Sequence, residues 1–210
     1  MTRILNLALV ALLLATTEAG ATRPTKGRAI RTGQTQSYGA DGDTTAGLTF
    51  MLKDLGNGVV KDQRTGLFWE KKSDDGSIHD KDNSYTWSVG IAPFQSTASG
   101  TAFTVFLATL NTPPCFAGHC DWRLPTVKEL GTIVDFGSGG PGVPQEFDND
   151  CSPGCTVASC SCTGIGRTWS STTYYYNSTY AWYVFFYFGN AERDVEKSGT
   201  ALVRAVRSGS

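Results

Sequence analysis

Six cysteines are the residues of this 210-residue chain whose type and spacing offer the most direct chemistry: Cys115, Cys120, Cys151, Cys155, Cys160 and Cys162. An even number of cysteines favours disulfides in an oxidising compartment. Cys115 and Cys120 bracket a short loop, so we expect them to pair with each other. The other four lie in CSPGCTVASCSC, where three pairings are possible and the spacing does not choose among them.

Four thiolates in one segment could instead hold zinc. Their spacing is C-x3-C-x4-C-x-C, however, whereas structural zinc sites usually have two separated C-x2-C pairs. We therefore predict a loop held by disulfides and no metal site.

Catalytic side chains are scarce. The chain has two histidines, His79 and His119, and it lacks the G-x-S-x-G, H-E-x-x-H and phosphate-binding glycine motifs. Asp148, Asn149 and Asp150 are the best candidates for calcium, which takes oxygen ligands from loops, but Asp and Asn are also common turn residues. We predict no enzyme and no cofactor, with calcium at these three residues as the alternative.

Residues 174–190, YYYNSTYAWYVFFYFGN, contain ten aromatic residues, where an even distribution would place about two. Strand alternation from Trp182 sends one set of side chains to the core and the other to solvent. The core set is Trp182, Val184, Phe186 and Phe188, and the solvent set is Tyr183, Phe185 and Tyr187. Tyr174–Tyr176, Asn177 and Tyr180 lie in a loop-like run without such a pattern.

This segment has two interpretations, a packed core strand and a binding surface. Exposed tyrosine with Ser, Thr and Asn is typical of antibody paratopes and of surfaces that stack against sugars. We predict a ligand-binding surface formed by residues 174–190 and parts of 191–202, with more than half of its six tyrosines exposed. Its candidate contact residues are Tyr174, Tyr175, Tyr176, Asn177, Ser178, Tyr180, Tyr183, Phe185, Tyr187 and Asn190.

The elements that would position this surface are short. Apolar residues at spacings of three and four predict a helix near 100–110, and a T-x-x-E capping box predicts a second helix that starts at Thr126. Strand patterns occur within 50–71, 180–188 and 202–207, and 137–168 reads as a long loop. These elements predict one α+β domain over 48–210, preceded by an irregular lead-in over 22–47.

Residues 4–15 form an apolar run after Arg3, followed by the small residues Ala19-Gly20-Ala21. The run is too short to span a bilayer comfortably, so residues 1–21 read as a secretory signal peptide. We therefore expect an exported protein (periplasmic, secreted or at the cell surface) with no membrane span. A net charge of −1 gives no basis for nucleic-acid binding.

Three blocks now combine: DQRTGLFWE at 62–70, DWRLPTVKEL at 121–130, and WSSTT at 169–173 with a terminal VRAVR. In this order they resemble the C-terminal domain family of the Legionella collagen-like protein, from about residue 31 to the end. The resemblance implies a C-type lectin-like fold related to formylglycine-generating enzymes, with late strands and loops that display a ligand-binding face. Some members act as adhesins for glycans. The last strands contain no cysteine, so catalysis is not carried over, and the charge does not support a sulfated ligand.

The last forty residues also resemble the variable region of proteins diversified by retroelements, in which a reverse transcriptase rewrites adenines in asparagine-type codons. The family-typical positions stay fixed: Trp169, Ser170, Ser171, Trp182, Val184, Phe186, Gly189, Lys197, Val203, Arg204, Val206 and Arg207. The ten candidate contact residues and Phe188 are all reachable from an Asn codon. This resemblance exposes Phe188, which alternation would bury, and a bulge before Gly189 could reconcile the two.

Together these patterns predict an exported, receptor-like or adhesin-like protein that binds an unknown protein or glycan at a cell or phage surface. A fixed-specificity glycan adhesin, an enzyme of the formylglycine-generating branch and a purely structural envelope component are the alternatives.

Overall fold

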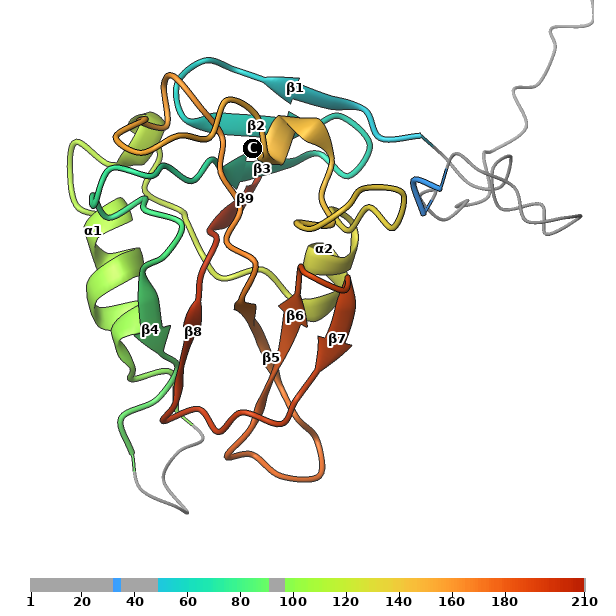
Figure 1. Ribbon diagram of the computed structural model, residues 1–210. Helices are drawn as coiled ribbons and strands as arrows, with labels where there is room; N and C mark the ends of the chain where they lie inside the picture. Colours follow the sequence, from blue (N-terminus) through green and yellow to red (C-terminus); the bar gives the residue numbers. More distant parts are fainter. Residues whose placement is uncertain (1–31, 35–48, 91–96, 210) are drawn as a thin grey trace, which may run out of the picture.

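The structure is a computed structural model that describes residues 32–34, 49–90 and 97–209. The expected signal peptide and all of the lead-in except 32–34 lie outside the described residues. The α+β prediction is confirmed, because the described chain forms two sheets and two short helices (Figure 1). No helix among the described residues is long and apolar enough to cross a membrane.

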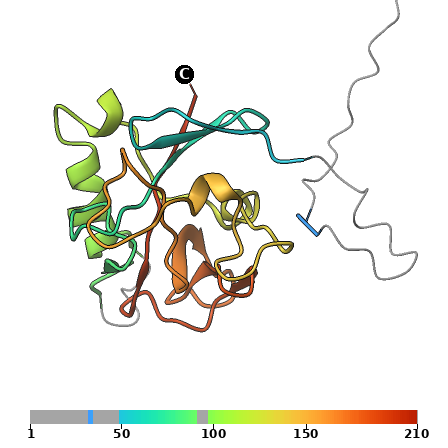
Figure 2. The same cartoon turned by 45° about the horizontal axis from the view of Figure 1, so that its top comes forward.

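The first sheet contains β1 (Leu52–Asp54), β2 (Val59–Asp62), β3 (Leu67–Glu70) and β9 (Val206–Ser208). Its strands follow the order β1-β2-β3-β9 and all pair antiparallel. The last strand of the chain therefore lies beside one of the first, and Figure 2 shows the β1–β2 hairpin above the later strands.

The second sheet contains β4 (Ser84–Thr86), β8 (Thr200–Leu202), β5 (Arg167–Thr173), β6 (Ala181–Phe185) and β7 (Asn190–Glu192), in that order. Only β5 and β8 pair in parallel. The predicted strand over 180–188 ends earlier, at Phe185. The predicted strand over 202–207 is divided between β8 and β9, so residues 203–205 carry the chain from one sheet to the other.

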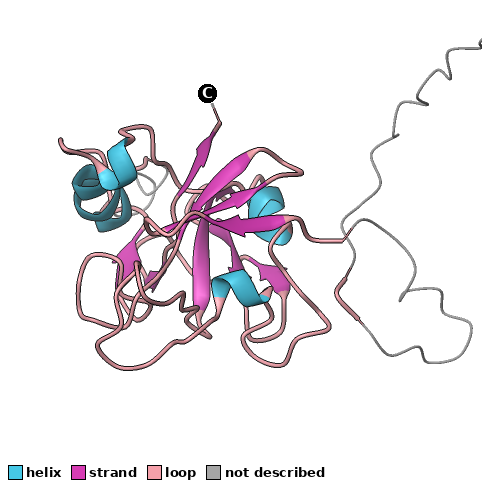
Figure 3. Ribbon diagram, turned by 90° about the horizontal axis from the view of Figure 1, so that it is seen from above, coloured by secondary structure: helices cyan, strands magenta, loops and turns pink. Residues whose placement is uncertain are grey.

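Both predicted helices are present. The first begins as a π-helix over Ala102–Leu107 and continues as α1 (Ala108–Leu110). The second, α2 (Val127–Gly131), is capped by Thr126, whose side chain accepts from the Glu129 amide while Glu129 accepts from the Thr126 amide. Short 3₁₀ turns over Phe116–Gly118 and Gln145–Phe147 complete the helical segments. Seen from above, the strands gather at the centre with helices around them (Figure 3).

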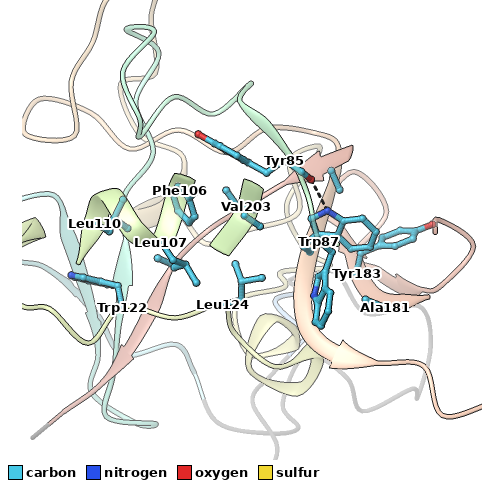
Figure 4. Close-up of a cluster of buried hydrophobic side chains, with 14 of the residues drawn as sticks. Tyr85, Trp87, Phe106, Leu107, Leu110, Trp122, Leu124, Ala181, Tyr183 and Val203 are labelled. Carbon is cyan, nitrogen blue, oxygen red and sulfur yellow. Dashed lines mark hydrogen bonds between the residues drawn. The ribbon is translucent and has the colours of Figure 1, made fainter. Parts of the chain in front are cut away.

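The core consists of two clusters that meet at β6. One contains Trp87, Phe106, Trp122 and Tyr183 (Figure 4), and the other contains Trp69, Leu130, Phe147, Val184 and Phe186. Successive residues of β6 therefore bury their side chains in different clusters. Both faces of this strand are covered, so its aromatic residues can be buried on either face.

Polar side chains gather around the end of β3; we call Glu70, Lys72, His79 and Arg204 the polar centre. The Glu70 carboxylate is fully buried and lies 3.2 Å from Lys72 Nζ, 2.7 Å from His79 Nδ1 and 2.9 Å from the Ala205 amide. Burial acts to raise the pKa of Glu70, but Lys72 and His79 outweigh it, so the pKa is lowered.

Arg204 completes the polar centre and connects three segments. It donates to the Glu70 carbonyl and the Cys162 carbonyl at 2.8 Å each, and to Thr163 Oγ1 at 2.7 Å. Burial lowers the pKa of Arg204 to about 10, so it is still charged at neutral pH. The carbonyl oxygens of distant segments thus converge on one guanidinium.

All six cysteines form disulfides, as predicted. Cys115 pairs with Cys120, and the open choice among the other four resolves as Cys151–Cys162 and Cys155–Cys160. Every sulfur is bonded to another sulfur, so none of them is a thiolate that could hold zinc. Three disulfides in one domain are typical of an extracytoplasmic compartment.

Candidate functional site: two aromatic clusters

The loop between β5 and β6, residues 174–180, carries the most exposed aromatic side chains. Tyr175 is 89% and Tyr176 83% exposed, and their rings contact each other at 5.2 Å. Asn177 Oδ1 accepts from the amide and hydroxyl of Thr179, and the Tyr174 amide donates to the Tyr180 carbonyl at 2.9 Å. Hydrogen bonds within the loop therefore fix its shape while its tyrosines project into solvent.

Behind this loop, two aromatic rings form a corner that holds a guanidinium. The rings of Tyr174 and Trp182 are nearly perpendicular, with centroids 5.9 Å apart. Arg193 lies over both, 5.2 Å from the Tyr174 centroid and 5.3 Å from the Trp182 centroid. Such cation–π contacts favour one position of the arginine. We call Tyr174, Trp182 and Arg193 the aromatic corner.

An open pocket of about 630 Å³ adjoins the aromatic corner. One wall comes from the loop after β5, and the other from the end of β7 and the two residues that follow it. Its lining residues are Tyr174, Asn177, Tyr180, Glu192, Arg193 and Asp194. Aromatic faces, an amide, two carboxylates and a guanidinium thus converge, which suits a ligand with both apolar and polar groups.

Tyr183 is not part of the exposed surface. It is fully buried, and its ring packs edge-on against Trp169 at 6.3 Å. Its hydroxyl contacts Asp194 and lies 3.0 Å from Glu192 Oε2, and it accepts from Arg167 Nε at 3.2 Å. Burial, with the neighbouring carboxylates, raises the pKa of Tyr183 well above its usual range. The predicted exposure of Tyr183 is wrong, because β6 is an interior strand with both faces covered.

A second aromatic cluster lies in the turn after β6 and contains Phe185, Tyr187 and Phe188. Tyr187 is 50% and Phe188 64% exposed, and their rings lie 4.7 Å apart. The amides of Phe188 and Gly189 both donate to the Phe185 carbonyl, so a turn, not a bulge, exposes Phe188. Gly189 has a φ of 71°, and a Cβ there would lie 2.7 Å from a Val134 methyl group.

The two clusters lie at opposite ends of β6 (Figure 1). The first comprises the loop tyrosines and the aromatic corner, and the second is the turn cluster. The predicted surface over 174–190 is therefore two separate surfaces. Only the first adjoins the large pocket.

With this geometry in place, sequence comparison assigns the chain to a family. A family model described as the Lcl C-terminal domain matches residues 58–207, which includes both aromatic clusters and all three disulfides. The chain belongs to this family. No curated protein matches it significantly.

Exposure in this Lcl C-terminal domain follows the prediction only in part. Tyr175, Tyr176 and Tyr187 are exposed, Tyr174 and Tyr180 are partly exposed, and Tyr183 is buried. Half of the six tyrosines are therefore exposed rather than more than half, although only one is buried. Of the remaining candidates, Asn177 and Ser178 are exposed, and Phe185 and Asn190 are partly exposed.

Sequence reasoning did not name Glu192, Arg193 and Asp194, which form one wall of the pocket in this Lcl C-terminal domain. Their alternation of acid, base and acid is visible in the sequence. That these residues lie beside the pocket follows only from the pairing of β7 with β6, in which Glu192 lies opposite Tyr183.

The calcium alternative receives no support from the contacts of its residues. The Asp148 carboxylate accepts from the Thr163 amide at 3.2 Å, and the Asn149 side chain donates to Asp150 at 2.7 Å. These hydrogen bonds are those expected of a turn. A different acidic group, Asp74, Asp80 and Asp82, is close-set, but the Lys81 ammonium already lies 2.5 Å from Asp82 and 3.3 Å from Asp74.

Proposed function

We propose that this Lcl C-terminal domain is an exported, receptor-like or adhesin-like module that binds a ligand through the first aromatic cluster. The two sheets act as a rigid support in a C-type lectin-like arrangement, and the loop after β5 supplies the contact residues. The observation that carries the proposal is a loop of fixed backbone that presents two almost fully exposed tyrosines beside an open pocket. Large, rigid side chains of this kind give contact area at low entropic cost.

We further propose that a retroelement diversifies this surface. Ten of the eleven positions reachable from an Asn codon are at least partly exposed, Tyr183 being the exception. Nine of the twelve positions expected to stay fixed are buried, among them Trp169, Phe186 and Arg204. Variation at exposed positions changes the ligand contacts while it leaves the core packing intact.

The proposal assigns no catalysis to the domain. The formylglycine-generating branch uses a reactive cysteine pair, and each of the six cysteines here is bonded in a disulfide. Burial of the charged polar centre is consistent with a structural role for those charges, since none of them adjoins the large pocket.

Deep sequencing of the last forty-five codons and their flank, in a population grown from one cell, tests diversification. We expect substitutions confined to adenine-derived positions, with a near-identical template repeat nearby. A fixed sequence without a template would contradict diversification and leave an adhesin with one ligand.

Binding itself is tested with the double variant Tyr175→Ser/Tyr176→Ser in screens against cell surfaces and glycan arrays. We expect it to lose binding, while Ile165→Ser, a control at another exposed apolar residue, retains it. Equal binding by the double variant and the wild-type protein would contradict the assignment of the ligand site to this loop.

A further inference from the structure

Arg193 is an exposed cation without a polar partner. Its guanidinium contacts the rings of Tyr174 and Trp182, but no hydrogen bond or ion pair joins it to any residue in the described ranges. Contact with two rings favours one position of the guanidinium and leaves its N–H groups available. An arginine held in this way is already ordered before a ligand arrives.

Glu192 and Asp194 line the same pocket as Arg193, but within the described ranges neither carboxylate forms an ion pair with its guanidinium. Glu192 is paired in register with Tyr183, so its side chain shares the Tyr183 face of the sheet, and alternation places Arg193 on the Trp182 face. Glu192 and Asp194 both contact the Tyr183 hydroxyl. The two acids therefore make their polar contacts with Tyr183, Asn190 and Arg167 rather than with Arg193.

A planar carboxylate is the group that matches a guanidinium, because two parallel N–H···O bonds can form. Trp, Tyr and Arg are also the residue types that most often dominate the binding energy of protein–protein interfaces. The aromatic corner contains one of each. It therefore has the composition of an interface anchor for a polypeptide.

The surrounding charge limits the ligand to a single acidic group. Glu192 and Asp194 line the same pocket, and Glu196 lies beside it with its carboxylate 3.4 Å from the Tyr180 hydroxyl. Three carboxylates near one arginine repel a chain of repeated negative charges, whereas one carboxylate flanked by neutral or basic groups is tolerated.

We propose that Arg193 binds the side-chain carboxylate of an aspartate or glutamate on a polypeptide partner, with Tyr174 and Trp182 holding the guanidinium in place. This rests on the proposed function, because it assigns a ligand class to the first aromatic cluster. Arg193 is the specificity-determining residue of that cluster.

A random peptide display library, selected on the mature protein, provides the probe. We expect the selected peptides to share an acidic residue. For the tightest peptide, replacement of that acid by its amide should weaken binding to the wild-type protein about tenfold, as expected for one charge-assisted contact. The same replacement should change binding to Arg193→Gln less than twofold.

Two further variants sharpen the test. Arg167→Gln removes another half-exposed arginine of the same sheet, which already contacts Tyr183 and Asp194, and it should leave the preference for the acid unchanged. Arg193→Lys keeps the charge but not the fork of donors, so it should restore only part of the acid preference.

The proposal is overturned if no peptide is selected, if the selected peptides lack a common acid, or if acid and amide peptides differ equally on wild-type and Arg193→Gln proteins. Displacement of the peptide by heparin through Arg193 would also overturn it, in favour of a polyanionic glycan. The proposed function fails separately, if peptide binding is unchanged in Tyr175→Ser/Tyr176→Ser.

Discussion

The polar centre and the first aromatic cluster of this domain differ in burial and in the origin of their contacts. Glu70 and Arg204 are almost fully buried, and the partners of Arg204 come from segments more than forty residues away. Tyr175 and Tyr176 are exposed, and their ring contacts are with other tyrosines of their own loop. A change in the polar centre therefore disturbs several segments at once, whereas a change in the loop disturbs only the loop.

One domain can therefore combine an interior that tolerates few substitutions with a surface that tolerates many. Buried charges need all of their partners, so substitutions there are costly. Exposed side chains on a backbone held by its own hydrogen bonds have few requirements. Substitutions in either region test this contrast.

Replacement of Arg204 by methionine should have the largest effect. It removes three hydrogen bonds and leaves the carbonyls of Glu70 and Cys162 without their donor. We expect the free energy of unfolding to fall by about 3–5 kcal/mol, measured by urea denaturation. The matched control is Arg193→Met, at an exposed arginine, which should change stability by less than about 0.5 kcal/mol. Equal losses of unfolding free energy in both variants would contradict the expected difference between the buried and the exposed arginine.

Loss of the disulfide Cys151–Cys162 should rank second. In Cys151→Ser/Cys162→Ser the closed loop is longer than the one in Cys115→Ser/Cys120→Ser, with sequence separations of 11 and 5. The loop-closure relation gives losses of about 3 and about 2 kcal/mol. Because the Cys162 carbonyl also accepts from Arg204, the first pair should cost more than loop length alone implies. Urea unfolding of the two double variants decides, and the opposite order would contradict this link to the polar centre.

Lys197 is a buried cation outside the polar centre, and it should make stability depend on pH. Burial lowers its pKa from 10.5 to about 8, although the ammonium lies 3.8 Å from the Trp87 ring centroid. Between these two values the unfolded chain binds more protons at this site than the folded chain. Stability should therefore rise with pH from 8 to 10.5, by up to about 2 kcal/mol, and this gain is absent below pH 8.

The control for Lys197 is Lys197→Met, which lacks the titrating group. The difference in unfolding free energy between this variant and the wild-type protein should change across that pH range and stay constant between pH 6 and 7. A constant difference across the whole range would show that the buried ammonium keeps its ordinary pKa.

The sequence predicts a structural feature of this molecule when the residues that determine the feature lie close together in the chain. The capping box of Thr126 and Glu129 and the pairing of Cys115 with Cys120 depend on a few adjacent residues, and both are confirmed. The choice of Cys151–Cys162 depends on how the loop folds back, which its spacing does not reveal.

The candidate site shows the same limit. Its loop tyrosines were found from composition, because exposed Tyr with Asn and Ser has few other uses. Tyr183 was misplaced because alternation gives two faces but not what covers them. Its burial requires Trp169 opposite it on β5 and the rest of the first core cluster over that face, which only the tertiary structure brings together.

Tyr183→Phe should have a moderate effect. The variant keeps the ring that packs against Trp169 but removes the hydroxyl that contacts Asp194, Glu192 and Arg167. We expect a loss of about 1 kcal/mol by urea unfolding, the usual value for one hydrogen bond. The control Tyr187→Phe, at a half-exposed tyrosine, should be nearly neutral. A loss above about 3 kcal/mol would place Tyr183 with the polar centre instead.

Substitution of the loop tyrosines should have the smallest effect on stability. Tyr175→Ser/Tyr176→Ser removes rings that are 89% and 83% exposed, and the hydrogen bonds of Asn177 with Thr179 that shape the loop remain. We expect a change of less than about 0.5 kcal/mol in the free energy of unfolding. A larger loss would mean that these rings support the fold, and diversification there would then endanger the protein. A neutral result, combined with lost ligand binding, would separate recognition from stability at the residues where the proposal requires it.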